Sequence, residues 1–101
     1  MAFTVAYRQA ARREITDAAR RYESERRGLA ATFLAEVVRI EAAISEAPQL
    51  YQAVGRGVRR ATLRRFPYGF FYLEEDDRIL VLACVDLRRD PQTISRIVSR
   101  R

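Results

Sequence analysis

The chain has 101 residues, of which 49% are hydrophobic, and its formal net charge of +6 corresponds to a pI of about 10.4. We expect residues 1–101 to form one domain with one small core, and a basic domain favours nucleic acid, an acidic protein or an anionic membrane surface as its partner. Because the sequence has no histidine, it excludes a ribonuclease with a histidine base and a histidine-ligated metal site.

The first half of the chain predicts a strand followed by a helical hairpin. Residues 3–7 alternate with a period of two, which is typical of a short strand. Two amphipathic helices follow, separated by Gly28, and the second ends at Pro48. Helices joined by so short a turn pack antiparallel, and their common apolar side needs a further layer to cover it. The apolar stripes are Ala11, Ile15, Ala18, Ala19 and Tyr22 in the first helix, and Phe33, Val37, Ile40 and Ile44 in the second.

The second half supplies that layer as strands. Residues 49–57 are predicted to be a loop, and strands are predicted over residues 58–65, 69–73 and 79–85. In the first of these strands, Ala61 and Leu63 take one face, whereas Arg60, Thr62 and Arg64 take the other. The acidic run 74–77 is predicted to be a solvated hairpin turn without a bound metal.

The last predicted strand is apolar on both faces, which is typical of a central strand. It contains Cys84, the only cysteine, which we expect to be a buried and unreactive thiol. Asp90 and Pro91 are predicted to open a short C-terminal helix, because aspartate caps helix N-termini and proline suits the first turn. The docking face of that helix is Ile94, Ile97 and Val98.

Together these elements predict an α+β fold of order βααβββα. The N-terminal strand and the helical hairpin pack on one face of a small, mainly antiparallel sheet, and a short C-terminal helix completes the chain. The sequence shows no secretory signal region, and no apolar run approaches the length of a membrane span. We therefore expect a cytoplasmic protein that does not enter a membrane.

Several strings of residues, taken in this order, resemble the RelE/ParE superfamily of type II toxins over essentially the whole chain. Each string is short, but their order and spacing together are specific. The matching positions are Phe33, Glu36, Val37, Ile40, Ile44 and Pro48 in the second helix, Val58, Arg59, Arg60 and Leu63 in the next strand, and then 65–68, Phe71, Tyr72, 77–79 and 88–91.

The resemblance implies a cognate antitoxin, similar to ParD, whose disordered acidic C-terminal segment folds onto the toxin in a hetero-oligomer. The basic composition of the chain fits such a partner independently, because coupled folding onto a charged, partly apolar groove is a common binding mode. The antitoxin could also bring the complex to DNA indirectly.

Two activities occur in the superfamily that this chain resembles. RelE-type members cleave mRNA in the ribosome, whereas ParE-type members inhibit DNA gyrase. The cleavage relies on several basic side chains and a tyrosine, which activate the 2′-hydroxyl and stabilise the phosphate in the transition state. In an alignment on residues 71–72, Arg60 matches the first basic position, and Arg88 or Arg89 matches the last.

The other catalytic positions have no match. Thr62 carries no charge, Gly69 has no side chain, and no tyrosine follows Tyr72, so that Ile94 or Ser95 falls at the tyrosine position. The resemblance therefore favours a gyrase inhibitor that needs no cofactor or metal and is not an enzyme. The alternatives are a RelE-like ribosome-dependent mRNA endoribonuclease and a non-toxic basic module that binds nucleic acid.

Two sets of side chains are candidates for contact with the target or the antitoxin. All 19 basic residues are arginines, which suit bidentate contacts to phosphate or carboxylate but also occur in GC-rich coding sequences. For the strand arginines, a solvated sheet face is the alternative. The predicted basic surface is Arg59, Arg60, Arg64, Arg65, Arg88 and Arg89. The predicted apolar patch for the antitoxin is Phe66, Tyr68, Phe70 and Tyr72.

Overall fold

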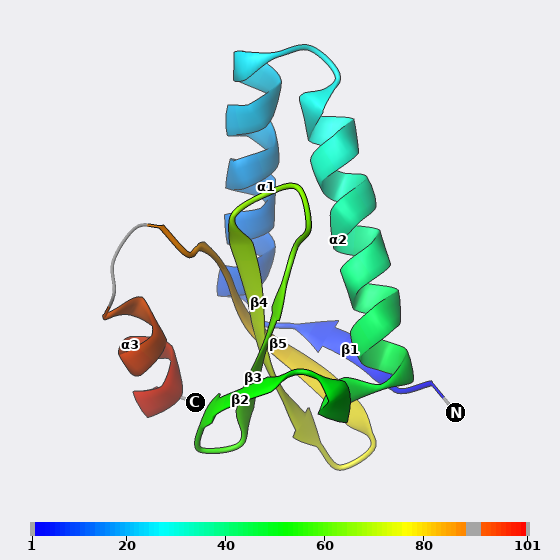
Figure 1. Ribbon diagram of the computed structural model, residues 1–101, viewed down its shortest axis with the longest axis vertical. Coiled ribbons are helices and arrows are strands. Elements are labelled where there is room, and N and C mark those ends of the chain that lie inside the picture. Colours follow the sequence, from blue (N-terminus) through cyan, green and yellow to red (C-terminus); the bar gives the residue numbers. More distant parts are fainter. Residues whose placement is uncertain (1, 89–91, 101) are drawn as a thin grey trace.

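A computed structural model describes residues 2–88 and 92–100 of the chain (Figure 1). A strand and a helical hairpin come first, four further strands follow, and a short helix comes last. The elements are β1 (Thr4–Tyr7), α1 (Gln9–Glu25), α2 (Leu29–Glu46), the 3-10 helix η1 (Pro48–Leu50), β2 (Gln52–Gly55), β3 (Val58–Thr62), β4 (Tyr68–Glu75), β5 (Arg78–Asp86) and α3 (Thr93–Ser99).

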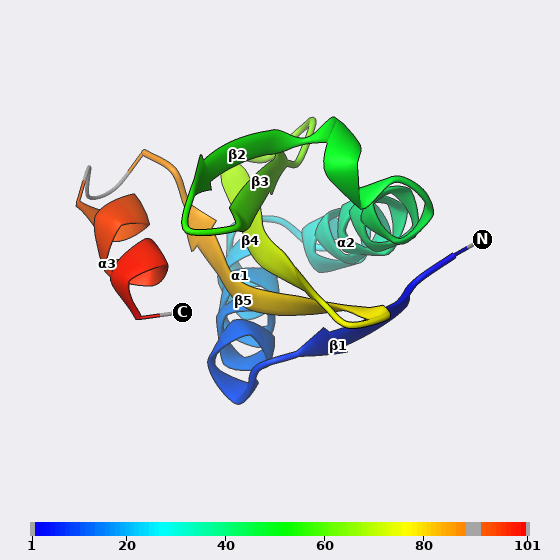
Figure 2. The same ribbon diagram turned by 90° about the horizontal axis from the view of Figure 1, so that it is seen from below.

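The strands form one sheet in the order β1-β5-β4-β3-β2. Three of the four pairings are antiparallel, and only β1 runs parallel to β5. The helical hairpin covers one face of the sheet, and α3 lies on the opposite face (Figure 2). Both faces are therefore covered, and the predicted α+β class with the hairpin on one face of a mainly antiparallel sheet is confirmed.

The two covered faces differ in composition. On the hairpin face, the apolar stripes of α1 and α2 pack on a largely aromatic set from β4 and the segment before it, which includes Phe66, Tyr68, Phe70 and Tyr72. On the α3 face, the sheet is mostly aliphatic, and α3 adds the partly buried side chains of Ile94, Ile97 and Val98. Because β5 contributes to both clusters, it is apolar on both sides, as the sequence predicted.

The predicted loop over residues 49–57 is wrong in one part, because it contains the edge strand β2. This strand turns into β3 through Arg56 and Gly57, whose φ angles of 51° and 83° are the pair of positive values that a two-residue hairpin turn requires. The observed order therefore has one strand more than βααβββα. The predicted strand 58–65 is also too long, because the chain leaves the sheet after Thr62 and the N–H of Leu63 closes the corner on the carbonyl of Tyr68, at 2.9 Å.

Two further predictions concern β4 and β5. The acidic run 74–77 was predicted to be a turn, but Glu74 and Glu75 belong to β4 and only Asp76 and Asp77 connect the strands. Cys84 is buried as expected, and burial raises the pKa of its thiol, so the reactive thiolate is disfavoured. Asp90 and Pro91, the predicted start of the last helix, lie outside the described residues.

Candidate functional site

The predicted basic residues of β3 are both hydrogen-bonded to residues 51–52, where the edge strand β2 begins. The Arg59 guanidinium donates to the backbone carbonyl of Tyr51 at 2.7 Å, and that of Arg60 donates to the side-chain oxygen of Gln52 at 2.7 Å. Because neighbouring residues of a strand point to opposite faces, the two arginines do not form one surface. Arg59 lies on the hairpin side with Ala61, whereas Arg60 lies on the α3 side.

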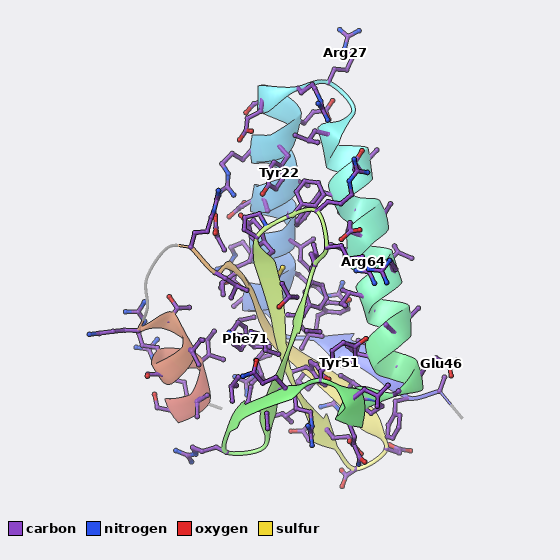
Figure 3. The ribbon with its side chains drawn as sticks, viewed as in Figure 1. Tyr22, Arg27, Glu46, Tyr51, Arg64 and Phe71 are labelled. Atoms are coloured by element: carbon purple, nitrogen blue, oxygen red, sulfur yellow. The ribbon has the colours of Figure 1, made fainter. Side chains whose placement is uncertain are left out.

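Arg64 and Arg65 lie at the corner between β3 and β4, so the prediction that Arg64 shares a sheet face with Arg60 is wrong. Their backbone N–H groups donate to one carboxylate oxygen of Glu36 on α2, at 2.8 and 3.5 Å. Burial by itself raises the pKa of Glu36. The two backbone hydrogen bonds and the side chain of Arg39 lower this pKa by more, so the net pKa lies below the usual range. Both arginine side chains remain exposed beside α2, where Figure 3 shows Arg64.

Arg88 follows β5 and pairs with Asp86, a residue that sequence analysis did not select. The Asp86 carboxylate accepts the backbone N–H of Arg88 at 2.9 Å and its guanidinium at 3.2 and 3.0 Å. These hydrogen bonds hold the pKa of Asp86 below its usual range, although burial opposes them. Arg89, the other basic residue predicted here, lies outside the described residues.

The predicted apolar patch of Phe66, Tyr68, Phe70 and Tyr72 is wrong as an exposed surface, because all four side chains are buried in the folded chain. Tyr68, Phe70 and Tyr72 alternate onto the hairpin face of β4, which α1 and α2 cover. The corner after β3 folds Phe66 under the same hairpin. These aromatic residues therefore build the core rather than a contact surface.

A groove of about 550 Å³ lies between α1, the end of β5 and α3. Arg21 on α1 spans it: its guanidinium donates to the Tyr68 hydroxyl and lies 5.8 Å from the centre of that ring. Arg21 is an exposed residue of α1, and this contact joins it to the buried ring of Tyr68. The polar lining is Glu14, Asp17, Arg21, Tyr68, Asp86, Thr93, Arg96 and Arg100.

A bulge in β5 shapes the floor of this groove. Phe71 pairs with Ala83 and Tyr72 with Val81, so Leu82 is the extra residue on β5. Past the bulge, the Cys84 N–H points away from β4 and donates to the Glu14 carboxylate of α1 at 2.9 Å. Burial raises the pKa of Glu14, and this hydrogen bond only partly offsets the effect. Glu14 therefore has a structural role, in which its carboxylate accepts a backbone hydrogen bond from the edge of β5.

Three of the residues aligned with the catalytic positions of RelE-type members, Arg60, Thr62 and Gly69, lie on the α3 face of the sheet. Arg60 and Thr62 alternate onto this face, and Gly69 pairs with Thr62. The space beside Gly69 is occupied, because a Cβ built there would lie 3.1 and 3.2 Å from the terminal carbons of Leu87 and 3.4 Å from Arg60 Cγ. Leu87 thus fills the space into which an arginine at position 69 of β4 would project.

Among residues 2–88 and 92–100, no group of three cysteine, aspartate and glutamate side chains is arranged to hold a metal ion. No helix in that part of the chain is long and apolar enough to cross a membrane. What the groove offers is a mixed set of arginines and carboxylates around a strand edge, which suits binding to a polar partner.

No protein-family profile and no curated protein matches the chain. Solved structures do match. The chromosomal ParDE toxin–antitoxin system of P. aeruginosa has a TM-score of 0.75 and 14% identity, covering 85% of this chain and 97% of that chain. A mutant of E. coli toxin RelE in the free state has a TM-score of 0.73 and 14% identity, covering 99% and 97%. The toxin–antitoxin complex RelBE2 of Mycobacterium tuberculosis has a TM-score of 0.62 and 22% identity, covering 85% and 99%. The chain therefore has the fold of the RelE/ParE superfamily.

Proposed function

We propose that this chain, which has the fold of the ParE and RelE toxins, is the toxin of a type II toxin–antitoxin pair and inhibits DNA gyrase. Its partner would be a ParD-like antitoxin with an acidic C-terminal segment, which neutralises it in a hetero-oligomer. Two of the similar structures come from toxin–antitoxin systems, and the net charge of +6 complements an acidic segment.

One observation carries the choice of gyrase over mRNA cleavage. On the α3 face, where the resemblance would put a basic cluster, Thr62 is neutral and Leu87 fills the space beside Gly69. Arg60 remains, but its guanidinium is hydrogen-bonded to Gln52. Stabilising a phosphate transition state needs several preorganised cations, and the loss of one such donor costs about 10²–10³ in rate. An inhibitor that acts by binding does not need this cluster.

The proposal is tested by inducing the chain in bacterial cells that lack the antitoxin. We expect growth to stop, plasmid DNA to lose negative supercoils, and ribosome-bound messages to keep intact 5′ and 3′ ends. Co-expression of the small reading frame beside the gene should restore growth. Messages cut at the ribosomal A site before any change in supercoiling would overturn gyrase as the target, and normal growth would overturn the toxin itself.

A further inference from the structure

Arginines gather on α1 and at the tip of the helical hairpin. Seven of the 19 basic residues of the chain lie within residues 8–27, and all seven are exposed. Five of them form a set that we call the arginine strip, which follows the exposed side of α1 and continues onto the hairpin tip. The strip consists of Arg12, Arg13, Arg20, Arg26 and Arg27.

Helical spacing keeps the strip on one side of the hairpin. Arg13 and Arg20 are seven residues apart, which is nearly two turns, so their side chains leave α1 on the same side and about 10 Å apart along the helix axis. Arg26 is the C-cap residue, and Arg27 lies in the turn that follows, where Figure 3 shows its side chain pointing away from the molecule. The strip therefore extends over about 20 Å, the length of helix between residues 12 and 26.

The carboxylates of α1 do not neutralise the strip. Glu14 accepts a backbone N–H of β5 at 2.9 Å, and Glu23 accepts two backbone N–H groups at the start of α2, at 3.2 and 3.1 Å. Asp17 lines the groove between α1 and α3. Within residues 2–88 and 92–100, no arginine of the strip forms a salt bridge. This leaves Glu25, the last residue of α1, to offset five arginines, so the strip presents net positive charge to water.

The other residues of this surface are polar, which suits a phosphate backbone better than a protein partner. Gln9 and Thr16 are exposed beside the arginines, and the only exposed apolar residue of α1 is Ala10. Protein interfaces have an apolar centre, which this surface lacks. Arginine together with glutamine and threonine is instead typical of contacts to DNA phosphates. Helix α1 exposes no aromatic ring on which unpaired bases could stack, because its Tyr22 is buried.

We propose that the arginine strip binds the phosphate backbone of duplex DNA directly, without reading the base sequence. Duplex DNA carries about one negative charge per 1.7 Å of its axis, so a strip about 20 Å long passes about 12 charges, enough to occupy every arginine in it. Guanidinium groups suit this role because they bind phosphate bidentately. The choice of DNA over duplex RNA rests on the proposed function, since gyrase acts on duplex DNA. A toxin held in this way can move along DNA to the enzyme that it inhibits.

The test measures binding of the full refolded chain to a fluorescein-labelled DNA duplex of about 20 base pairs by fluorescence anisotropy. Five phosphate contacts give a slope of about −4 to −5 when the logarithm of the association constant is plotted against that of the salt concentration. The variant R13Q/R20Q should make this slope less steep by about 2 and weaken binding at least tenfold at about 50 mM salt. Glutamine has nearly the helix propensity of arginine, so circular dichroism should show an unchanged fold.

The matched control is R64Q/R65Q, which removes the same charge from two exposed arginines at the corner beside α2 and should leave the slope unchanged. Equal losses from the two double variants would overturn the strip, because they would show only general attraction to a basic protein. Binding of duplex RNA at least tenfold more tightly than DNA of the same sequence would replace DNA with RNA. Displacement of the DNA by polyglutamate of equal charge and concentration would replace the phosphate backbone with an acidic chain.

The binding assay contains no gyrase, so its result is separate from that of the proposed function. A chain that binds DNA through the strip but leaves gyrase fully active would overturn the proposed function and support the strip. A chain that inhibits gyrase but does not bind the duplex at about 50 mM salt would overturn the strip alone.

Discussion

The helices on the two faces of the sheet are held in place by different contacts. On the hairpin face, aromatic rings interlock: Phe33 lies 5.2 Å from Phe66 and 5.4 Å from Tyr68 between ring centres, and Tyr22 lies 4.8 Å from Phe66. On the α3 face, the covering helix has seven residues, none of which is buried. The same strands β4 and β5 thus separate a tightly interlocked layer from a lightly attached one.

The hairpin face contributes more to the stability of this molecule than the α3 helix does. Hydrogen bonds from distant parts of the chain also converge on the hairpin side, including those of Glu36 to the corner and of Tyr72 to Pro48. Substitutions there should act mainly on folding. Helix α3 and the groove at its edge can change with less cost to the fold, because no residue of α3 is buried.

The largest expected effect is on the hairpin face, from Phe33→Ala. Phe33 is fully buried among the aromatic rings, so its removal leaves a cavity, and we expect the free energy of unfolding to fall by about 3–5 kcal/mol. Urea denaturation followed by circular dichroism measures this. A loss below about 1 kcal/mol would mean that the aromatic cluster does not hold the hairpin on the sheet.

A smaller loss is expected from Tyr72→Phe, which removes one hydroxyl from the same layer. That hydroxyl donates to the carbonyl of Pro48 at 2.6 Å in a buried position. The variant leaves this carbonyl without its donor, and we expect a destabilisation of about 1–2 kcal/mol. The matched control is Tyr51→Phe, on a half-buried ring that Figure 3 shows beside η1, and it should change the unfolding free energy less.

Glu36→Gln tests the link between α2 and the corner through its pH dependence. The pKa of Glu36 lies below its ordinary value of 4.5, so the carboxylate stabilises the folded state above that pH. The side chain is 11% exposed, and we expect the variant to lose about 1 kcal/mol at pH 7. The gap between the two proteins should close as the pH falls below 4.5. A gap that stays constant down to pH 3 would contradict the role of the charge.

The smallest effect is expected on the α3 face, from Ile97→Ala. Ile97 is only partly buried against the aliphatic cluster, so its truncation should cost about 1 kcal/mol or less. Unfolding of this variant and of Phe33→Ala under the same conditions compares the two faces directly. A larger loss from Ile97→Ala than from Phe33→Ala would reverse the contrast between the faces.

Periodicity predicted the elements that bury one continuous stripe. Phe33, Val37, Ile40 and Ile44 are buried on α2 as their spacing indicated, and the apolar run of β5 is a central strand. Strand β2 was missed because residues 52–55 are neither strongly alternating nor strongly apolar, as is common in a short edge strand. Its one sequence signal was the pair Gly55 and Gly57 around a tight turn.

The site was harder to predict because its contacts join distant parts of the chain. Glu14 and Cys84 are 70 residues apart, and Arg21 and Tyr68 are 47 apart, so no local pattern indicates either pair. The burial of both Phe71 and Tyr72 depends on a second covering layer, which strand alternation alone does not reveal. Asp86 could have been found as an acid two residues before Arg88, but their pairing depends on how β5 ends.

The most direct test of the proposed target is supercoiling of relaxed plasmid by DNA gyrase and ATP, with the refolded chain added in increasing amounts. A parallel reaction contains programmed ribosomes and mRNA. We predict that supercoiling falls, that the antitoxin restores it, and that the message stays intact. Full supercoiling together with message cut at the ribosomal A site would contradict the account and would mean that Arg60 and its neighbours on the α3 face suffice for cleavage.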